Sequence, residues 1–484
     1  MTARRAPPPP SPSLAFFDAA RPAATPGGLH PPGGSSRLGR ILRGGLLAGG
    51  LAGAAALGAA GSVAAGESAP AAPGAGVRPN VVFILTDDQR IGDFGCYGNA
   101  RAVTPNVDAL AARGTRFTNA MVTCPVCGPS RINLLTGRYL SRFVEAPCNE
   151  KNSFPSGQPT VAGLLKAAGY QTGIVGKIHF KVTGIQPAKG TKLTIQDQLK
   201  AVGFTFVESV HPYNAEPGIH INEQEKAFDS AIKFVTQNKD RPFALFVLTT
   251  LTHGPFEAPA KYKELVKPQG GDLKAAMTTW LDSETGRLLA EVDRLGLRER
   301  TAVFYAADNA PATGGGDNNK GTCYDGRIAQ IVSWPGGGVK AGAAVEALTQ
   351  NIDYLPTILE ICGVPVPPEA KPDGRSFLPL LTGKPYEPRK VTFLEHGAAR
   401  AVRTDRWKYI AVRSVKNFPE ARELKAYAGQ ADLLFDLQAD PDEKKNLFKD
   451  PAHAAALKEL QWLLRAHCAT YDYPFGEFGG GGRK

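Results

Sequence analysis

Four short, strongly apolar runs constrain the fold of this chain more than any other feature. They cover residues 81–86, 172–176, 243–253 and 301–309. Each has the length and the β-branched and aromatic content of a buried strand. Helix-like segments at 104–114, 160–170 and 277–296 alternate with them. This alternation predicts an α/β domain built on a large, buried and largely parallel sheet.

The C-terminal part of the chain differs in its sequence pattern, with Pro-rich segments and shorter apolar runs. Two Pro-rich segments, 364–374 and 383–390, are typical of boundary regions. The shorter strand-like runs that follow predict a small antiparallel sheet, with a final helix over about 452–467. We therefore expect a large domain over 77–385 and a smaller α+β subdomain over 386–484.

The first 76 residues do not look like part of the folded domain. Residues 1–36 are rich in Pro, Gly and Ala, and Arg37, Arg40 and Arg43 then precede an uncharged stretch over 44–65. A basic region, an apolar stretch and small residues at Val63 and Ala65 are typical of a secretory signal peptide. An Ala/Gly linker or a membrane anchor would also fit. We predict export, to a secreted or periplasmic location, with no stable membrane span after processing.

The formal net charge of +11 carries little information about partners. The first 65 residues contribute +5 of it, which leaves +6 for the remainder. That balance is typical of an ordinary soluble surface and is also compatible with an anionic substrate. Because no basic stripe is interleaved with aromatic residues, we expect no nucleic-acid partner.

Polar residues with useful chemistry follow each of the four predicted strands. In α/β sheets the ligand crevice lies at the carboxyl ends of the strands, so these side chains could converge on one site. A single Asp-Asp pair is more often a solvated loop or a cap. The full set offers three carboxylates and one amide oxygen, which suits Ca²⁺ or Mg²⁺ rather than Zn²⁺. The residues are Asp87, Asp88, Lys177, His179, His253, Asp308 and Asn309.

The segment from Cys127 to Arg131 predicts an anion-binding helix start. Pro129 suits the first turn of a helix, which places Cys127 just before it. Free N–H groups there favour an anion, Arg131 adds a positive charge, and the pKa of the thiol should be depressed. The chain has seven cysteines. A structural thiol, or a redox pair with Cys124, are the alternatives.

These residues resemble those of the formylglycine-dependent sulfatases, members of the alkaline phosphatase-like superfamily. The resemblance runs from about residue 79 to residue 446, and its most specific part is CGPSRINLLTGRY at 127–139. The segments VVFILTDDQRIGDFGCYG, GKIHF and THGPFEAP resemble further landmarks of the family. The resemblance to this family implies a large, mixed, mostly parallel sheet flanked by helices, and a smaller C-terminal subdomain with an antiparallel sheet.

The resemblance also implies a reaction and a role for each residue. Cys127 would be converted to formylglycine by a formylglycine-generating enzyme, and one hydroxyl of its hydrate would attack the sulfur of a sulfate ester. The alcohol would leave, and collapse of the sulfated hydrate would expel sulfate. Arg131 would steady the formylglycine and His179 would be the base of the elimination. Lys177, Lys320 and His253 would hold sulfate oxygens, and His253 or Lys320 would help to protonate the leaving group. The Ca²⁺ ligands would be Asp87, Asp88, Cys127, Asp308 and Asn309.

Some of the function stays open at this level. The chain departs from the family at Ala310, where Gly is usual, and around Arg327, which is displaced. A phosphonate monoester or phosphodiester hydrolase with the same formylglycine, or a secreted binding protein with a relict site, would carry similar residues. Whether the sulfated substrate is a carbohydrate or a small aryl ester is not encoded in a readable motif.

Overall fold

A computed structural model describes residues 78–144, 153–187, 191–213, 220–311, 320–397, 399–412 and 432–471. The predicted leader, residues 1–76 with its signal-peptide segment, lies outside this part of the chain. Within the described residues, no helix is both long and apolar enough to cross a membrane.

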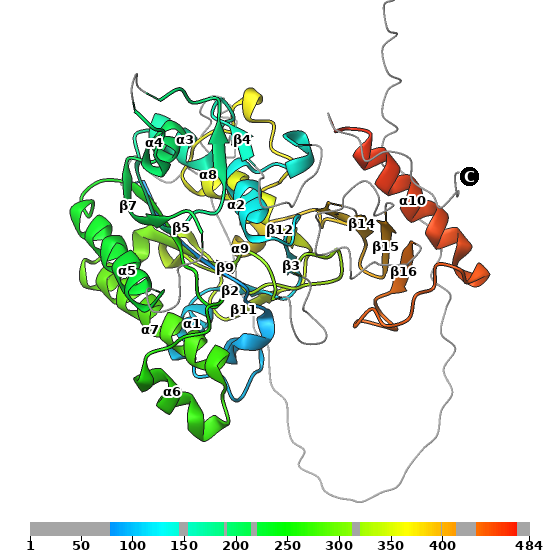
Figure 1. Ribbon diagram of the computed structural model, residues 1–484, viewed down its shortest axis with the longest axis horizontal. Coiled ribbons are helices and arrows are strands. Elements are labelled where there is room, and N and C mark those ends of the chain that lie inside the picture. Colours follow the sequence, from blue (N-terminus) through cyan, green and yellow to red (C-terminus); the bar gives the residue numbers. More distant parts are fainter. Residues whose placement is uncertain are drawn as a thin grey trace, which may run out of the picture. The chain divides into compact units, whose positions relative to one another are not determined.

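An eight-stranded sheet forms the centre of the protein (Figure 1). Its strand order is β11-β2-β10-β9-β1-β8-β5-β7. The run from β9 to β7 is parallel, β10 is antiparallel to both of its neighbours, and β11 is parallel to β2. The predicted mixed, mostly parallel sheet is therefore confirmed. The strands are β1 (Asn80–Thr86), β2 (Thr115–Phe117), β5 (Gln171–Lys177), β7 (Phe206–His211), β8 (Phe243–Leu248), β9 (Thr301–Ala307), β10 (Gln330–Ser333) and β11 (Ala343–Val345).

The four strands predicted from the apolar runs are β1, β5, β8 and β9, and they are neighbours in the order β9-β1-β8-β5. β1, β8 and β9 are buried along their whole length. Phe83 of β1 stacks between Phe246 of β8 and Phe304 of β9, with ring centroids 5.9 and 5.4 Å away. Apolar side chains on both faces explain why these strands read as continuous apolar runs.

Two helical layers cover the sheet. Val81 and Phe83 pack into the same core as helices α2 (Cys127–Thr136), α3 (Val161–Ala167), α4 (Ile195–Ala201) and α8 (Tyr354–Ile361). Val82 and Ile84 face the opposite core, with α1 (Pro105–Ala112), α5 (His220–Gln237), α6 (Ala260–Val266) and α7 (Leu273–Arg294). As predicted, α1 begins at Pro105 with Thr104 as its N-cap.

The strand predicted over 243–253 is shorter in the structure, because β8 ends at Leu248. Beyond that point the Thr249 hydroxyl accepts the N–H of Leu251, and the chain turns. Asp87 N–H then donates to the Leu251 carbonyl at 2.9 Å, and Thr252 N–H donates to the Asp87 carbonyl at 2.7 Å. The segment that carries His253 is therefore tied to the end of β1 rather than extended.

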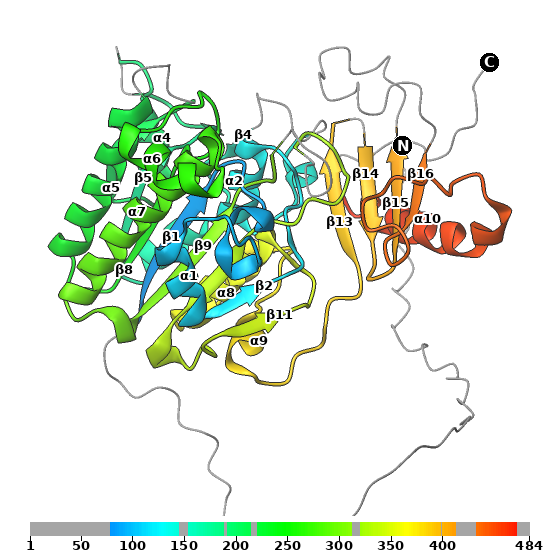
Figure 2. The same ribbon diagram turned by 90° about the horizontal axis from the view of Figure 1, so that it is seen from below.

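A separate antiparallel sheet follows in the C-terminal part of the chain (Figure 2). Its strands are β13 (Thr392–His396), β14 (Ala399–Arg403), β15 (Trp407–Val412) and β16 (Leu433–Asp436), in that order. Helix α10 (Ala454–Cys468) packs on β14 and β15 through Leu460 and Leu464. The predicted small sheet and final helix are confirmed, and the helix starts two residues later than expected. Two short strand pairs, β3 (Ala120–Met121) with β12 (Thr349–Gln350) and β4 (Ser153–Pro155) with β6 (Lys181–Thr183), complete the sheets of the described chain.

Candidate active site

The polar residues that follow the adjacent strands lie close together, as the sequence predicts. One ligand atom from each of Asp87, Asp88, Cys127 and Asp308 lies within 4.8 Å of the others. Asp87 and Asp88 follow β1, Asp308 follows β9, and Cys127 begins helix α2. The parallel arrangement of β1 and β9 brings their carboxyl ends, and hence these carboxylates, to one edge of the sheet.

Asp87 is the charge centre of the cluster. Its side chain is fully buried; Oδ1 accepts from Cys127 Sγ at 3.1 Å, and Oδ2 accepts from Arg131 Nη2 at 3.0 Å and Lys177 Nζ at 2.5 Å. Burial acts to raise the pKa of Asp87, but Lys177, His253 and Arg131 outweigh it and hold the pKa well below its usual value. Asp87 is therefore an anion held by two buried cations.

Arg131 links the two strand ends. Its Nε and Nη2 donate to Asp308 Oδ2 at 3.0 and 2.7 Å, and its Nη1 donates to the Lys177 carbonyl. Burial, followed by the charge of Asp87, raises the pKa of Asp308 to about 7. A guanidinium is suited to this place because its fixed fork of donors reaches two carboxylates and a carbonyl at once.

Asp88 and Asn309 present further oxygen atoms to the cluster. Lys320 Nζ donates to both Asp88 carboxylate oxygens, at 2.7 and 2.9 Å, and Asn309 Nδ2 donates to Asp88 Oδ1 at 2.6 Å. Among the described residues, the buried Asn309 Oδ1 has no hydrogen-bond partner. A buried amide oxygen without a donor, beside three carboxylates, is a group that a cation would satisfy.

The donor set fits a divalent metal ion. It consists of hard oxygens from Asp87, Asp88, Asp308 and Asn309, with Cys127 beside them. Hard oxygen ligands suit Ca²⁺ or Mg²⁺ better than Zn²⁺, as expected from the sequence. A cation would also relieve the repulsion among the carboxylates.

Two histidines border this cluster. His253 Nε2 lies 3.8 Å from Asp88 Oδ2, and its Nδ1 lies 2.7 Å from the Gly254 carbonyl oxygen. His179 follows β5, and its backbone N–H donates to the Pro212 carbonyl at 3.1 Å. Burial, with Lys177 second, lowers the pKa of His179 to about 3, so the ring is neutral at physiological pH.

Cys127 differs in two respects from the sequence prediction, its position in the helix and the pKa of its thiol. It is the first residue of α2 rather than the residue before it, and Pro129 lies in the first turn. The predicted depressed pKa is wrong: burial and the charges of Asp308 and Asp87 hold the pKa of the thiol well above its usual value. The favourable effect of the helix N-terminus on the Cys127 thiolate does not offset burial and the two adjacent carboxylates. Cys127 is a free thiol whereas Cys124 is disulfide-bonded, so the two do not form a redox pair.

Sequence reasoning missed the residues that hold this edge of the sheet in place. The buried Gln224 of α5 accepts, through Oε1, from Thr249 Oγ1 at 2.7 Å and from Thr250 N–H at 3.3 Å. His211 Nε2 lies 3.0 Å from Thr250 Oγ1. These contacts fix the segment that is tied to Asp87 and leads to His253. The run Thr-Thr-Leu-Thr after β8 is the only sequence signal for it, because Gln224 lies in an ordinary amphipathic helix.

We predict that Gly128→Ala will disrupt this site. A Cβ at Gly128 would lie 2.1 Å from the carbonyl oxygen of His179, and both groups are backbone-fixed. We expect a stability loss of about 1–3 kcal/mol and a loss of activity of about 10²-fold from the displacement of α2 or His179. Thermal unfolding and steady-state kinetics would measure both.

Gly157→Ala is the matched control for that substitution. No heavy atom lies within 4 Å of the corresponding Cβ, and its φ is not positive. Its stability should stay within about 0.5 kcal/mol of wild type. Equal activity of the two variants would contradict the close approach of Gly128 and His179.

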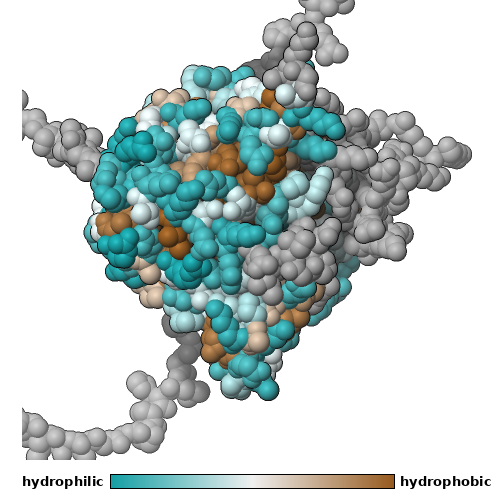
Figure 3. Space-filling model, turned by 60° about the vertical axis from the view of Figure 1, so that its left-hand side comes forward, coloured by the Kyte–Doolittle hydropathy of each residue, from teal (hydrophilic) through white to brown (hydrophobic). Residues whose placement is uncertain are grey.

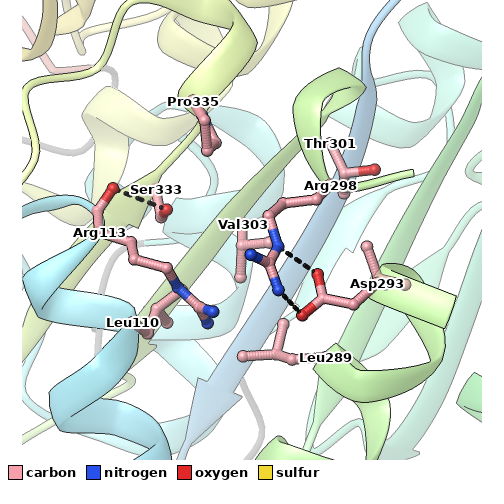
Figure 4. A pocket seen from close by; sticks show the side chains of 10 residues that line it. Leu110, Arg113, Leu289, Asp293, Arg298, Thr301, Val303, Ser333 and Pro335 are labelled. Atoms are coloured by element: carbon pink, nitrogen blue, oxygen red, sulfur yellow. Dashed lines mark hydrogen bonds and ion pairs between the residues drawn. The ribbon is translucent and has the colours of Figure 1, made fainter. Parts of the chain in front are cut away.

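Two cavities elsewhere do not belong to this site. One is lined by Leu110, Val303 and Ser333, with an Arg298–Asp293 ion pair beside it (Figure 4). It lies near the start of β9, at Thr301, whereas Asp308 follows the end of that strand. The other borders β16. The face in Figure 3 is largely hydrophilic, with separate hydrophobic patches.

Comparisons with known proteins agree on one family. The family model described as Sulfatase matches residues 79–364, and one described as N-sulphoglucosamine sulphohydrolase, C-terminal, matches 324–469. Human arylsulfatase A is 31% identical over 80% of this chain and 88% of that protein. An N-acetylgalactosamine-6-O-sulfatase from Bacteroides thetaiotaomicron is 27% identical over 80% of this chain and 93% of that protein.

Solved structures support the fold. One solved structure is described in connection with the metabolism of multiple glycosaminoglycans by Bacteroides thetaiotaomicron. It has a TM-score of 0.67 at 26% identity, and the match covers 81% of this chain and 99% of that chain. A phosphonate monoester hydrolase from Silicibacter pomeroyi has a TM-score of 0.64 at 21% identity, and covers 82% of this chain and 97% of that chain. The second likeness shows a shared fold only.

Proposed function

Because this chain belongs to the sulfatase family and is a sulfuric ester hydrolase, we propose that it removes sulfate from carbohydrate esters, with Ca²⁺ and an aldehyde made from Cys127. The observation that carries this proposal is the convergence of Asp87, Asp88 and Asp308 on Cys127. Cationic side chains line the same cluster, as expected for a site that receives an anionic ester.

Asp87, Asp88, Asp308 and Asn309 would hold the metal ion, with the modified Cys127 as a further ligand. When bound, the ion would supply Lewis acidity and lower the pKa of a hydroxyl on the modified side chain. We favour Ca²⁺ because a site built almost wholly from protein oxygens suits it, whereas Mg²⁺ usually keeps several waters.

The cationic side chains would bind the sulfate group and stabilise the charge that develops on its oxygens. Lys177 is fully buried, while Lys320 and His253 remain partly exposed, with 17% and 24% of their side chains accessible. Lys320 or His253 can therefore reach an arriving ester and donate a proton to the leaving alcohol. Arg131 would keep its place beside Asp87 and Asp308, and neutral His179 would accept a proton when sulfate is expelled.

Conversion of Cys127 to formylglycine accounts for the properties of the thiol. A thiol with a raised pKa is a poor nucleophile, so the encoded side chain is unsuited to the reaction. Its side chain is also only 1% exposed and lies in a helix that is buried at every position. We propose that a formylglycine-generating enzyme modifies Cys127 before the chain folds.

Two features of the chain support export: a signal-peptide pattern near the N-terminus and a disulfide at Cys124. The segment over 37–65 has the pattern of a signal peptide. The disulfide at Cys124 is typical of an oxidising compartment such as the periplasm or the extracellular space. We propose a secreted or periplasmic enzyme, without nucleic-acid partners.

A substrate panel with and without metal would test the proposal. We expect the purified enzyme to hydrolyse N-acetylgalactosamine 6-sulfate and 4-nitrophenyl sulfate. Activity should fall by at least about 10²-fold after chelation and return with Ca²⁺ more fully than with Mg²⁺. Preferred turnover of a phosphonate monoester or an aryl phosphodiester would favour the alternative that the shared fold allows.

A further inference from the structure

Exposed aromatic side chains lie beside both histidines of the candidate active site. Among the described residues, three aromatic side chains are prominently exposed: Tyr213 at 58%, Phe256 at 59% and Trp462 at 59%. Single exposed apolar residues are common on protein surfaces. Here, however, two of the three lie beside histidines that border the metal-binding cluster: Tyr213 contacts His179, and Phe256 lies three residues after His253.

Tyr213 lies beside His179. Lys177 pairs with His211 in the parallel β5–β7 ladder, and the Ile178 N–H donates to the His211 carbonyl at 2.9 Å. This pairing carries Tyr213 to the end of β7, where its ring meets the His179 ring edge to face at a centroid distance of 6.0 Å. The tyrosine is therefore placed by backbone pairing next to the proposed base.

Phe256 lies beside His253. The two are joined through Gly254, whose carbonyl oxygen is 2.7 Å from His253 Nδ1. Ring atoms of Phe256 lie 3.7 and 3.8 Å from the position that a Cβ on Gly254 would occupy, so the ring folds back over this residue. Its outer face remains open to solvent.

The alcohol part of a bound ester would extend from the metal-binding cluster toward its partly exposed side, where His253 lies. Lys177, Arg131 and Asp87 are completely buried below, whereas His253 is partly exposed. β5 pairs in parallel with both β7 and β8, so the segments that follow β7 and β8, which carry Tyr213 and Phe256, leave the sheet at the same end. A group attached to the sulfate is thereby brought toward Tyr213 and Phe256.

The open setting of the two rings favours a sugar over an apolar aryl group. An aryl group gains most from an enclosed apolar pocket. Tyr213 and Phe256 are 58% and 59% exposed, so neither side chain is enclosed in this way. A sugar ring can lay its C–H face on an aromatic side chain and keep its hydroxyls in water, as amphipathic contacts of Tyr and Trp do.

We propose that Tyr213 and Phe256 are specificity-determining residues that stack against the sugar ring carrying the sulfate ester. The inference rests on the proposed function and adds the residues that select its substrate. Because stacking would be similar in the ground state and the transition state, its loss should appear in KM rather than in kcat.

The test compares Tyr213→Ala and Phe256→Ala with Trp462→Ala, an equally exposed aromatic on α10. Steady-state kinetics would use N-acetylgalactosamine 6-sulfate and 4-nitrophenyl sulfate, with inorganic sulfate as a competitive inhibitor. We expect each site variant to raise KM for the sugar by about 10-fold with kcat within about 2-fold. The KM for the aryl ester and the inhibition constant of sulfate should change less, and Tyr213→Phe should behave as wild type.

Each other outcome has a definite meaning. An unchanged sugar KM in both site variants, or an equal rise in Trp462→Ala, would overturn the role of Tyr213 and Phe256 while the sulfatase activity stands. Hydrolysis of the aryl ester alone by wild type would overturn both the sugar assignment and this role. Wild-type protein with intact metal binding but no turnover of either ester would reject the proposed function itself. Thermal unfolding would verify that every variant is folded.

Discussion

Cys127→Ala should remove sulfatase activity almost completely, by at least about 10⁴-fold, as expected when an enzyme loses its nucleophile. The substitution deletes the side chain that we propose is converted to an aldehyde. Hydrolysis of a sulfate ester at saturating substrate would measure the effect, and intact-peptide mass spectrometry would show the state of residue 127 in the wild type.

The structure predicts that this variant will stay folded. Cys127 Sγ makes one contact with Asp87, which keeps its bonds from Arg131 and Lys177. Loss of one such hydrogen bond should cost about 1 kcal/mol. Cys96→Ala, at a half-buried free thiol with its own contacts near Asp108, is the control and should retain activity. Undiminished turnover by Cys127→Ala, or an unmodified cysteine in fully active wild type, would rule out the formylglycine mechanism.

Much of the fold could be predicted from sequence because its signals are local. Strands buried on both faces must be apolar at every position, and Val81–Leu85 shows this directly. Thr104-Pro105 marks the start of α1 for a similarly local reason. The residues at the ends of β1 and β9 could be grouped because parallel strands bring their carboxyl ends to one edge.

The parts that could not be predicted depend on contacts between distant segments. Gln224 is 25 residues from Thr249, and nothing in its helix distinguishes it from a surface glutamine. The pKa of Cys127 is raised by burial and by Asp308 and Asp87, which are 181 and 40 residues away in the chain, so the local pattern of a helix start predicted a pKa shift in the wrong direction. Likewise, the proximity of Tyr213 to His179 could not be predicted, because it depends on the pairing of β5 with β7.

Asp87→Asn should cost both stability and activity. The carboxylate is completely buried and receives Arg131, Lys177 and Cys127. Neutralising it leaves Lys177 without its buried counter-charge, which is expected to cost about 3–5 kcal/mol. The loss of a proposed metal ligand should lower activity by at least about 10³-fold. Denaturant unfolding, Ca²⁺ titration and sulfate-ester kinetics would measure the three effects.

The adjacent Asp88→Asn separates metal binding from folding. Asp88 is partly exposed, its side chain being 15% accessible, and it pairs with Lys320, which is also partly exposed. Its φ of 58° lies in the left-handed region, which Asn adopts readily, so the backbone gains no strain. We expect a smaller loss of stability than for Asp87→Asn, about 1–3 kcal/mol from the weakened hydrogen bonds to Lys320 and Asn309, but a loss of Ca²⁺ affinity and activity comparable to that of Asp87→Asn. If Asp88→Asn unfolded as readily as Asp87→Asn, burial would not be what distinguishes these two carboxylates; if it kept full Ca²⁺ affinity, Asp88 would not be a metal ligand.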